Sequence, residues 1–214
     1  MPRLFFVIAL AVAVVLASAA VVLLPPTQRL LVALSPVPHL PDADRLAVAR
    51  QLVWYFVTGE NSGLARYRAD ERAHLAEVAL LVRTAVGILG LAMATVGLTG
   101  RQVVRRDGWQ SLNQLRRRAL WATAAGCLIL LTSLTLLFNT LFAGLHPLLF
   151  NAPWWFDPSV SLLINEFPPE YFRAAFFVVL LTAVAVSLGL SVDWGELRSR
   201  HKKNPRSSTG NTGV

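Results

Sequence analysis

The sequence predicts an all-α membrane protein with four transmembrane helices and short interfacial helices in two extracytoplasmic loops. The mean hydropathy is +0.53, and 55% of the residues are hydrophobic while only 15% are charged, a smaller charged share than soluble domains carry. Crossing a hydrocarbon core takes about 20 consecutive apolar residues. Four windows reach that length, at about 4–24, 75–98, 119–145 and 171–192.

The positive charges predict how these helices are oriented. The segment 99–118 carries six arginines against the single acid Asp107, and five more basic residues follow the last window. The segment 146–170 contains no lysine or arginine. Because short loops rich in Lys and Arg stay in the cytoplasm, both termini are expected there, and the clustering does not indicate nucleic-acid binding. Residues 1–198 are expected to form one membrane domain, and 199–214 a disordered basic cytoplasmic tail.

The first window has an alternative reading as a cleaved signal peptide. Ala17-Ser18-Ala19 resembles the small-residue site at which such peptides are cut. The apolar run continues through Leu24 and is longer than a typical signal core, which favours a retained helix. The other three windows keep their orientation in either case. The single cysteine, Cys127, excludes an internal disulfide framework.

The first outer loop, residues 25–73, is too long and too apolar for a plain tether. Its prolines predict extended or turn-like chain in the first part. Asp42 and Asp44 can then cap a helix that runs to about Val57 and lies in the headgroup region. Farther on, acidic residues stand at the expected N-terminus of the second window, where the helix dipole favours them.

The other outer loop repeats this character. Pro153-Trp154-Trp155-Phe156 predicts an interfacial aromatic cluster. Asp157-Pro158 reads as an N-cap followed by proline at the first helical position, which predicts a short helix over 159–167. The prolines after it start the fourth window. Together the two outer loops are expected to roof the helical bundle.

Two histidines are the best functional clue. His74 precedes the second window and His146 follows the third, so both should emerge at the extracytoplasmic surface. The nearby carboxylates are those of Glu71, Glu77, Asp157 and Glu166. A carboxylate beside a histidine orients the ring, so that the other ring nitrogen can serve as a base. Ionisable groups in membrane segments usually have a function, which favours a role for both histidines. The simpler interpretation is that both are interfacial residues.

Other polar residues have competing readings. Arg83 lies nine residues beyond His74, roughly 13 Å deeper along a helix. It could hold an acidic or carbonyl group of a ligand, or it could be a structural partner for backbone carbonyls or Asn139. Asp157 has capping as its more ordinary role, and Trp154 and Trp155 more often form an interfacial belt. No catalytic, phosphate-binding or metal-binding motif is present, so neither a metal nor a cofactor is expected.

A resemblance to a known family rests on three motifs. These are Glu71-x-x-His74-Leu-x-Glu77-Val, the segment from His146 to Trp154-Trp-Phe-Asp-Pro, and Leu162-Leu-Ile-x-x-Phe-Pro-x-x-Tyr-Phe172. The pattern resembles the bacterial four-span lipoprotein intramolecular transacylases, over the whole chain except its tail. Known members move the sn-2 acyl chain of a diacylglyceryl-modified lipoprotein cysteine onto the α-amino group of that cysteine, which gives the lyso form.

The resemblance implies a multi-pass enzyme of the bacterial plasma membrane, with its active site on the extracytoplasmic side. Its partners would be diacylglyceryl lipoproteins and membrane lipid, with no nucleic acid and no obligate protein partner. We expect His74 and His146 to be catalytic, supported by Glu71, Glu77, Asp157 and Arg83. We expect substrate contacts from Trp154, Trp155, Tyr55 and Glu166.

The reaction suits these residue types. An α-amino group with a pKa near 8 must lose a proton before it attacks the ester, and histidine titrates in the right range to accept it. The tetrahedral oxyanion needs donors, and holding both reactants on one molecule supplies much of the rate. Either histidine could be the base, while the other donates a proton or accepts the acyl group transiently. The competing classes are a non-enzymatic protein that binds metal or haem through His74 and His146, and a membrane scaffold.

Overall fold

The computed structural model describes residues 1–61, 63–151 and 155–192, and within these ranges the chain is helical with no strand. Helix α1 (Pro2–Ala20) continues into the 3-10 turn η1 (Val21–Leu23). The much longer α4 spans Ala69–Leu149, and α6 spans Pro169–Ser191. These three are long and apolar enough to cross a membrane, with α1 and η1 counted as one.

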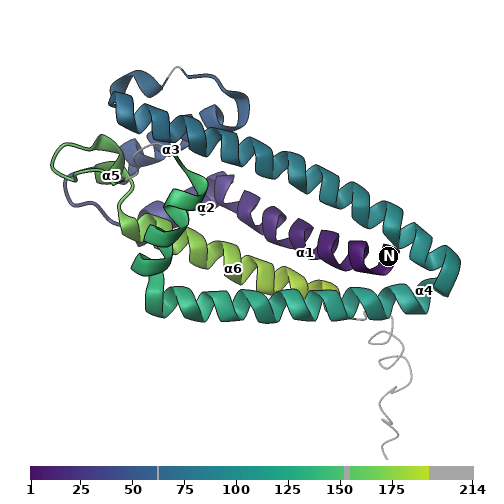
Figure 1. Ribbon diagram of the computed structural model, residues 1–214. Coiled ribbons are helices and arrows are strands. Elements are labelled where there is room, and N and C mark those ends of the chain that lie inside the picture. Colours follow the sequence, from purple (N-terminus) through teal and green to yellow (C-terminus); the bar gives the residue numbers. More distant parts are fainter. Residues whose placement is uncertain (62, 152–154, 193–214) are drawn as a thin grey trace, which may run out of the picture.

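Helix α4 turns back on itself at Gly108. At 81 residues it would be about 120 Å long if straight, several times the thickness of a bilayer. Gly108 has φ 81° and ψ 170°, a backbone conformation that only glycine adopts without strain. The two arms on either side therefore run antiparallel (Figure 1). The sequence predicted a loop over 99–118, which is wrong because the helix is interrupted there at this one residue.

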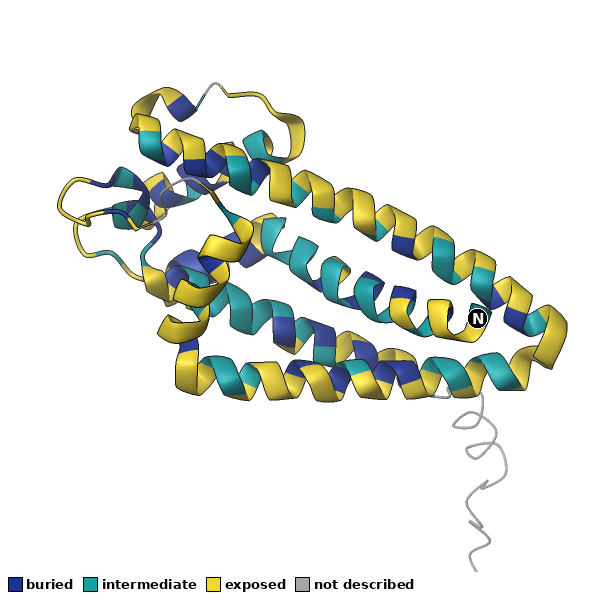
Figure 2. Ribbon diagram, viewed as in Figure 1, coloured by how far each residue is buried: buried dark blue, intermediate teal, exposed yellow. Residues whose placement is uncertain are grey.

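Helices α1 and α6 pack against the two arms of α4. A buried cluster in the middle of the bundle consists of Val14, Leu120, Cys127, Leu180 and Ala183. Outside this core much of the surface of the long helices is exposed (Figure 2). The exposed residues include the apolar Leu91, Ile129 and Leu136, which are about two-thirds exposed or more. Such an apolar surface is unfavourable in water and favourable in lipid, which agrees with a membrane protein.

Short helices cover the end of the bundle opposite Gly108 (Figure 1). They are α2 (Pro25–Leu34), α3 (Asp42–Thr58), the 3-10 turn η2 (Leu64–Arg66) and α5 (Leu162–Glu166). We call this group the cap. Extended chain was predicted where α2 lies, and the prediction is wrong because its two prolines occupy the first helical positions, where a backbone N–H is not needed.

The predicted capping residues also differ from those in the structure. Helix α3 starts at Asp42 as predicted, but Asp42 and Asp44 lie in its first turn and make no side-chain cap. The N-cap of α5 is Ser161, whose hydroxyl accepts from the Ile164 N–H, so the helix is shorter than predicted. Asp157 instead closes a tight turn, in which its carboxylate accepts from the Ser159 N–H at 2.8 Å.

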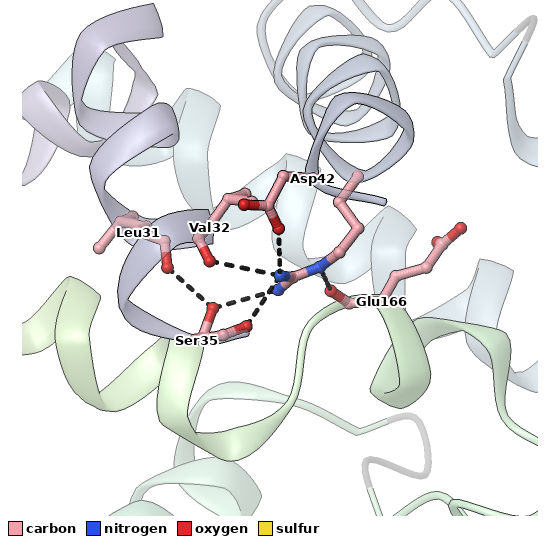
Figure 3. A network of polar contacts seen from close by, with 6 residues as sticks. Leu31, Val32, Ser35, Asp42 and Glu166 are labelled. Atoms are coloured by element: carbon pink, nitrogen blue, oxygen red, sulfur yellow. Dashed lines mark hydrogen bonds and ion pairs between the residues drawn. The ribbon is translucent and has the colours of Figure 1, made fainter. Parts of the chain in front are cut away.

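A buried arginine joins the two halves of the cap (Figure 3). Arg45, only 1% exposed, donates to the Ser35 carbonyl at 2.8 Å and to the Glu166 carbonyl at 2.9 Å. Its other contacts are the Val32 carbonyl, the Ser35 hydroxyl and the Asp42 carboxylate. A guanidinium has five donors in a fixed plane, so one side chain satisfies several carbonyls at once. It holds α2, α3 and α5 in register over the bundle.

Candidate active site

The structure brings His74 and His146 together from opposite arms of α4. Their ring centroids are 6.1 Å apart and the ring planes differ by 19°. Both residues are buried, each with 9% exposure. The imidazoles therefore form a pair enclosed beneath the cap, as their positions at the window ends predicted.

A bend in α4 accompanies this approach. Leu137 departs from helical geometry, with φ −128° and ψ 24°, and the chain beyond it turns across the end of the bundle (Figure 1). Just before the bend, the hydroxyls of Ser133 and Thr135 donate to carbonyls four residues earlier, an arrangement that often bends helices. The sequence predicted a window over 119–145 that is long enough to tilt or to emerge from the bilayer, and it did not predict this bend.

The protonation of His146 is set by its own helix. Its Nδ1 lies 2.7 Å from the Phe142 carbonyl oxygen. A carbonyl can only accept, so Nδ1 carries the proton and a neutral ring keeps its lone pair on Nε2. His74 Nδ1 is buried and has no hydrogen-bond partner among the described residues. The two imidazoles therefore have different surroundings, which suits two different roles in proton transfer.

Aromatic rings enclose the pair. Phe142 lies 4.0 Å and Phe150 5.3 Å from the His146 ring, centroid to centroid. Phe150 and Phe156 pack edge-on against His74 at 4.8 and 5.7 Å. These residues were not predicted as part of the site. The spacing in the sequence could have indicated two of them, because Phe142 and Phe150 stand four residues before and after His146, on the same helix face.

The two glutamates near His74 both bind the segment that follows His146. Glu71 is fully buried, and its Oε1 accepts from the Ser161 hydroxyl at 2.6 Å and the Leu163 N–H at 2.9 Å. Its Oε2 accepts from the Arg68 N–H at the start of α4. Glu77 accepts from the Asn151 N–H at 3.0 and 3.1 Å. These carboxylates hold the loop after His146 against the helix that carries His74.

Arg83 caps another helix. It donates to the carbonyls of Phe56 and Tyr55 at 3.1 and 3.2 Å, at the C-terminus of α3, where a cation is favoured. Of the two readings from sequence, the structure therefore supports a partner for backbone carbonyls. The Tyr55 ring lies 6.0 Å from the Arg83 guanidinium and does not line the cavity beside His74 described below.

Glu166 is buried within the cap. Its carboxylate accepts from the Tyr67 hydroxyl at 2.7 Å and pairs with Arg66. Burial raises the pKa of Glu166, and the Tyr67 hydrogen bond and Arg66 oppose that shift. Burial also raises the pKa of Tyr67. Glu166, predicted as a substrate contact, thus has cap residues as its partners. Trp154, another predicted substrate contact, lies outside the described residues.

An apolar cavity opens from His74 into the bundle. It has a volume of about 230 Å³, and its walls include Leu52, Leu75, Val78 and Phe172. A second apolar cavity of about 360 Å³ shares Val22, Leu23, Val78, Val82, Phe172 and Ala175 with it and continues between α1, α4 and α6. Gln28 and Tyr171 line the cavity beside His74, and the Tyr171 hydroxyl donates to Gln28 Oε1. Gln28 and Tyr171 were not predicted from sequence.

A polar cavity of about 340 Å³ lies beyond Phe156. Arg68, Asp70, Asp157 and the largely exposed Trp155 line it. Phe156 belongs to this cavity and also contacts the His74 ring, so this aromatic side chain links the cavity to His74. The hydrogen bond from the Ser159 N–H lowers the pKa of Asp157, which keeps that carboxylate charged at neutral pH.

Within the described ranges, no three side chains of His, Cys, Asp or Glu converge as metal ligands would. The described residues therefore give the metal-binding alternative no support beyond the two imidazoles themselves.

Comparison with known proteins identifies the family. The family model for the lipoprotein intramolecular transacylase Lit matches residues 3–172. The structure of the membrane integral lipoprotein intramolecular transacylase Lit from Bacillus cereus superposes with a TM-score of 0.77, at 17% identity over 95% of each chain. A variant of it with histidine replaced by arginine gives a TM-score of 0.73 at 17% identity, over 95% of this chain and 92% of the other. No curated protein sequence matches.

At such low identity the structural likeness shows a shared fold, whereas the family match extends over most of the chain. The non-enzymatic readings of the histidine pair are therefore set aside. The chain belongs to the lipoprotein intramolecular transacylase family Lit, and is a membrane-integral enzyme of lipoprotein maturation.

Proposed function

We propose that this protein moves the sn-2 acyl chain of a diacylglyceryl-modified lipoprotein cysteine onto the α-amino group of that cysteine. The observation that carries the proposal is the His74–His146 pair, in which His74 lines an apolar cavity and contacts Phe156 at the wall of a polar one. A substrate with an acyl chain at one end and a charged peptide terminus at the other needs both surroundings. The reacting ester and amine would then meet at the imidazoles.

The proposed orientation in the bacterial plasma membrane follows from the distribution of charge. Three arginines precede the Gly108 turn and three follow it, and such clusters remain cytoplasmic. The two arms of α4 would then be separate spans, giving four with α1 and α6, with both termini in the cytoplasm. The cap would lie at the extracytoplasmic surface, its short helices at the level of the headgroups. A diacylglyceryl lipoprotein in the outer leaflet reaches that depth directly.

The apolar cavity suits the acyl chain. Its walls are almost entirely hydrocarbon, and it continues from His74 toward the middle of the bundle. Burying each methylene stabilises the complex by about 0.8 kcal/mol. The carbonyl end of the chain would stay near the imidazoles, because the deeper walls offer no polar partner.

The polar cavity suits the amino terminus of the lipoprotein. Before it reacts, the α-amino group is mostly a cation at neutral pH. Asp70 and Asp157 would attract it, and Arg68 could hold a backbone carbonyl. Trp155 and Phe156 add apolar surface at the boundary with the acyl site.

In the proposed reaction the two histidines divide the proton transfers. Once the α-ammonium group has lost one proton to water, the neutral amine nitrogen attacks the ester carbonyl carbon, and His146 Nε2 accepts the second proton. The C–N bond forms and the C–O bond to the sn-2 oxygen breaks. That oxygen leaves as a glycerol hydroxyl, with the proton supplied by His74 in its imidazolium form. The proton gained by His146 then passes to His74, which restores both rings. The products are an amide and a free sn-2 hydroxyl, so atoms and charge balance.

Mass spectrometry of a lipoprotein tests this proposal. The protein is expressed in a bacterium that lacks its own N-acylating enzyme, and the N-terminal peptide of an abundant lipoprotein is analysed. We expect an N-acylated, S-monoacylglyceryl cysteine with the unchanged protein and with His39→Ala, a matched control at an exposed loop histidine. His74→Ala and His146→Ala should each leave the diacylglyceryl form. Lyso product from the double variant would contradict the assignment.

A further inference from the structure

A third large cavity lies at the opposite end of the molecule from the histidines. It measures about 530 Å³ and is formed by the start of α1 and by both arms of α4 near Gly108. Phe6, Leu10 and Leu112 provide apolar walls, while Arg101, Arg105 and Arg116 carry the charge. No residue of the proposed acyl-transfer site lines this cavity.

The cavity has an uncompensated positive charge. Its described lining contains three arginines and no carboxylate. The nearby acid, Asp107, already forms an ion pair with Arg3 at 3.1 Å. Arg116 Nε is buried and has no hydrogen-bond partner among the described residues. A buried cationic donor without an acceptor is unfavourable, so an anion that reaches Arg116 would be stabilised there.

The walls of the cavity restrict the identity of that anion. Apart from the arginines, they are mostly hydrocarbon, and Trp109 is 69% exposed at the same site, as interfacial tryptophans are. A cytoplasmic cluster of arginines by itself serves to orient the helices. That role does not require three arginine side chains around one apolar cavity, nor a buried donor without a partner.

We propose that this cavity binds an anionic phospholipid of the cytoplasmic leaflet. The phosphodiester group would lie among Arg101, Arg105 and Arg116, and an acyl chain would pack along Phe6 and Leu10. Basic pockets between membrane helices on the cytoplasmic side bind anionic headgroups in this way. The proposal requires the membrane orientation given above but not the acyl-transfer reaction.

Native mass spectrometry of the full-length, delipidated protein tests the proposal. The protein in detergent is titrated separately with phosphatidylglycerol, with phosphatidylcholine of the same acyl chains, and with inorganic phosphate. We expect retention of phosphatidylglycerol well above phosphatidylcholine. Arg101→Gln/Arg116→Gln should weaken phosphatidylglycerol binding by about tenfold or more, since each basic residue contributes a several-fold effect.

The matched control is Arg117→Gln/Arg118→Gln, which removes the same charge from exposed positions outside the cavity. We expect it to change binding by less than about twofold. Arg101→Gln alone, at an exposed position, tests the site if the Arg116 variant does not fold. Equal losses in both double variants would overturn the proposal, as would equal retention of the two lipids. Retention of inorganic phosphate in place of lipid would also overturn it.

Discussion

The hydroxyl of Ser161 donates a 2.6 Å hydrogen bond to Oε1 of Glu71, which joins residues 90 positions apart. The same oxygen accepts from the Leu163 N–H at the start of α5, and the other oxygen accepts from the Arg68 N–H at the start of α4. One buried carboxylate therefore fixes two helix N-termini relative to each other. His74 lies one turn farther along α4, so Glu71 positions the helix that carries it.

Replacing this carboxylate should destabilise the cap. In Glu71→Gln the amide nitrogen would face the Arg68 N–H or the Ser161 hydroxyl, and we expect a loss of about 2 kcal/mol from a broken buried charged hydrogen bond. Thermal unfolding in detergent measures this loss. The control is Asp70→Asn, which removes a surface pair with Arg68 and should cost less than about 1 kcal/mol. Equal midpoints for both variants would show that Glu71 does not anchor the cap.

Glu166 should make cap stability depend on pH. Burial raises its folded-state pKa above the ordinary value of 4.5, so the protonated form is favoured in the folded state. Its contribution to stability is therefore full below pH 4.5 and is lost as the pH rises through the raised pKa. As the pH rises across that window, we expect the unfolding midpoint of the wild type to fall relative to that of Glu166→Gln. A difference that stays constant with pH would contradict the shift.

The proposed acyl site predicts selectivity for chain length. Val78 lines both apolar cavities, so Val78→Trp should obstruct the passage from one to the other. Transfer of a long sn-2 chain should fall by about tenfold or more, since losing contact with two methylenes costs about 1.6 kcal/mol. A short chain should be transferred almost normally. Synthetic diacylated lipopeptides with different sn-2 chains measure the ratio of rates.

Leu80→Trp is the control for that substitution. Leu80 lies on the same arm of α4 but is 65% exposed on its outer face, and it lines neither cavity. We expect both chain lengths to be transferred at the wild-type rate. A loss of long-chain transfer in the Leu80 variant as well would assign the effect to the helix and not to the cavity.

The sequence predicted the helical membrane fold and the convergence of the two histidines because both follow from hydropathy and charge. Apolar windows determine where spans begin and end, and therefore where His74 and His146 emerge. It did not predict the surroundings of the histidines. Phe156 comes from the loop after α4, and its contact with His74 depends on long-range packing that local pattern does not encode.

Arg45 shows the same limit in the cap. In sequence it is one charged residue on a helix expected to lie in the headgroup region, and nothing in the pattern distinguishes it from a solvated arginine. The structure buries it because two segments, the end of α2 and the end of α5, present three carbonyl groups to one guanidinium. The acceptors come from residues far apart in the chain, and the interaction is visible only once the helices are placed.

The turn of α4 should be sensitive to substitution of Gly108. With φ 81° and ψ 170°, it occupies a region in which a Cβ is strained even though no other atom crowds the position. Gly108→Ala should therefore destabilise the protein by about 1–3 kcal/mol. Gly126→Ala, in the helical second arm with equally open surroundings, should be neutral or stabilising by up to about 1 kcal/mol. A lower unfolding midpoint for Gly108→Ala but not for Gly126→Ala would confirm that the reversal of chain direction in α4 depends on the backbone of Gly108. Equal changes in the two variants would contradict it.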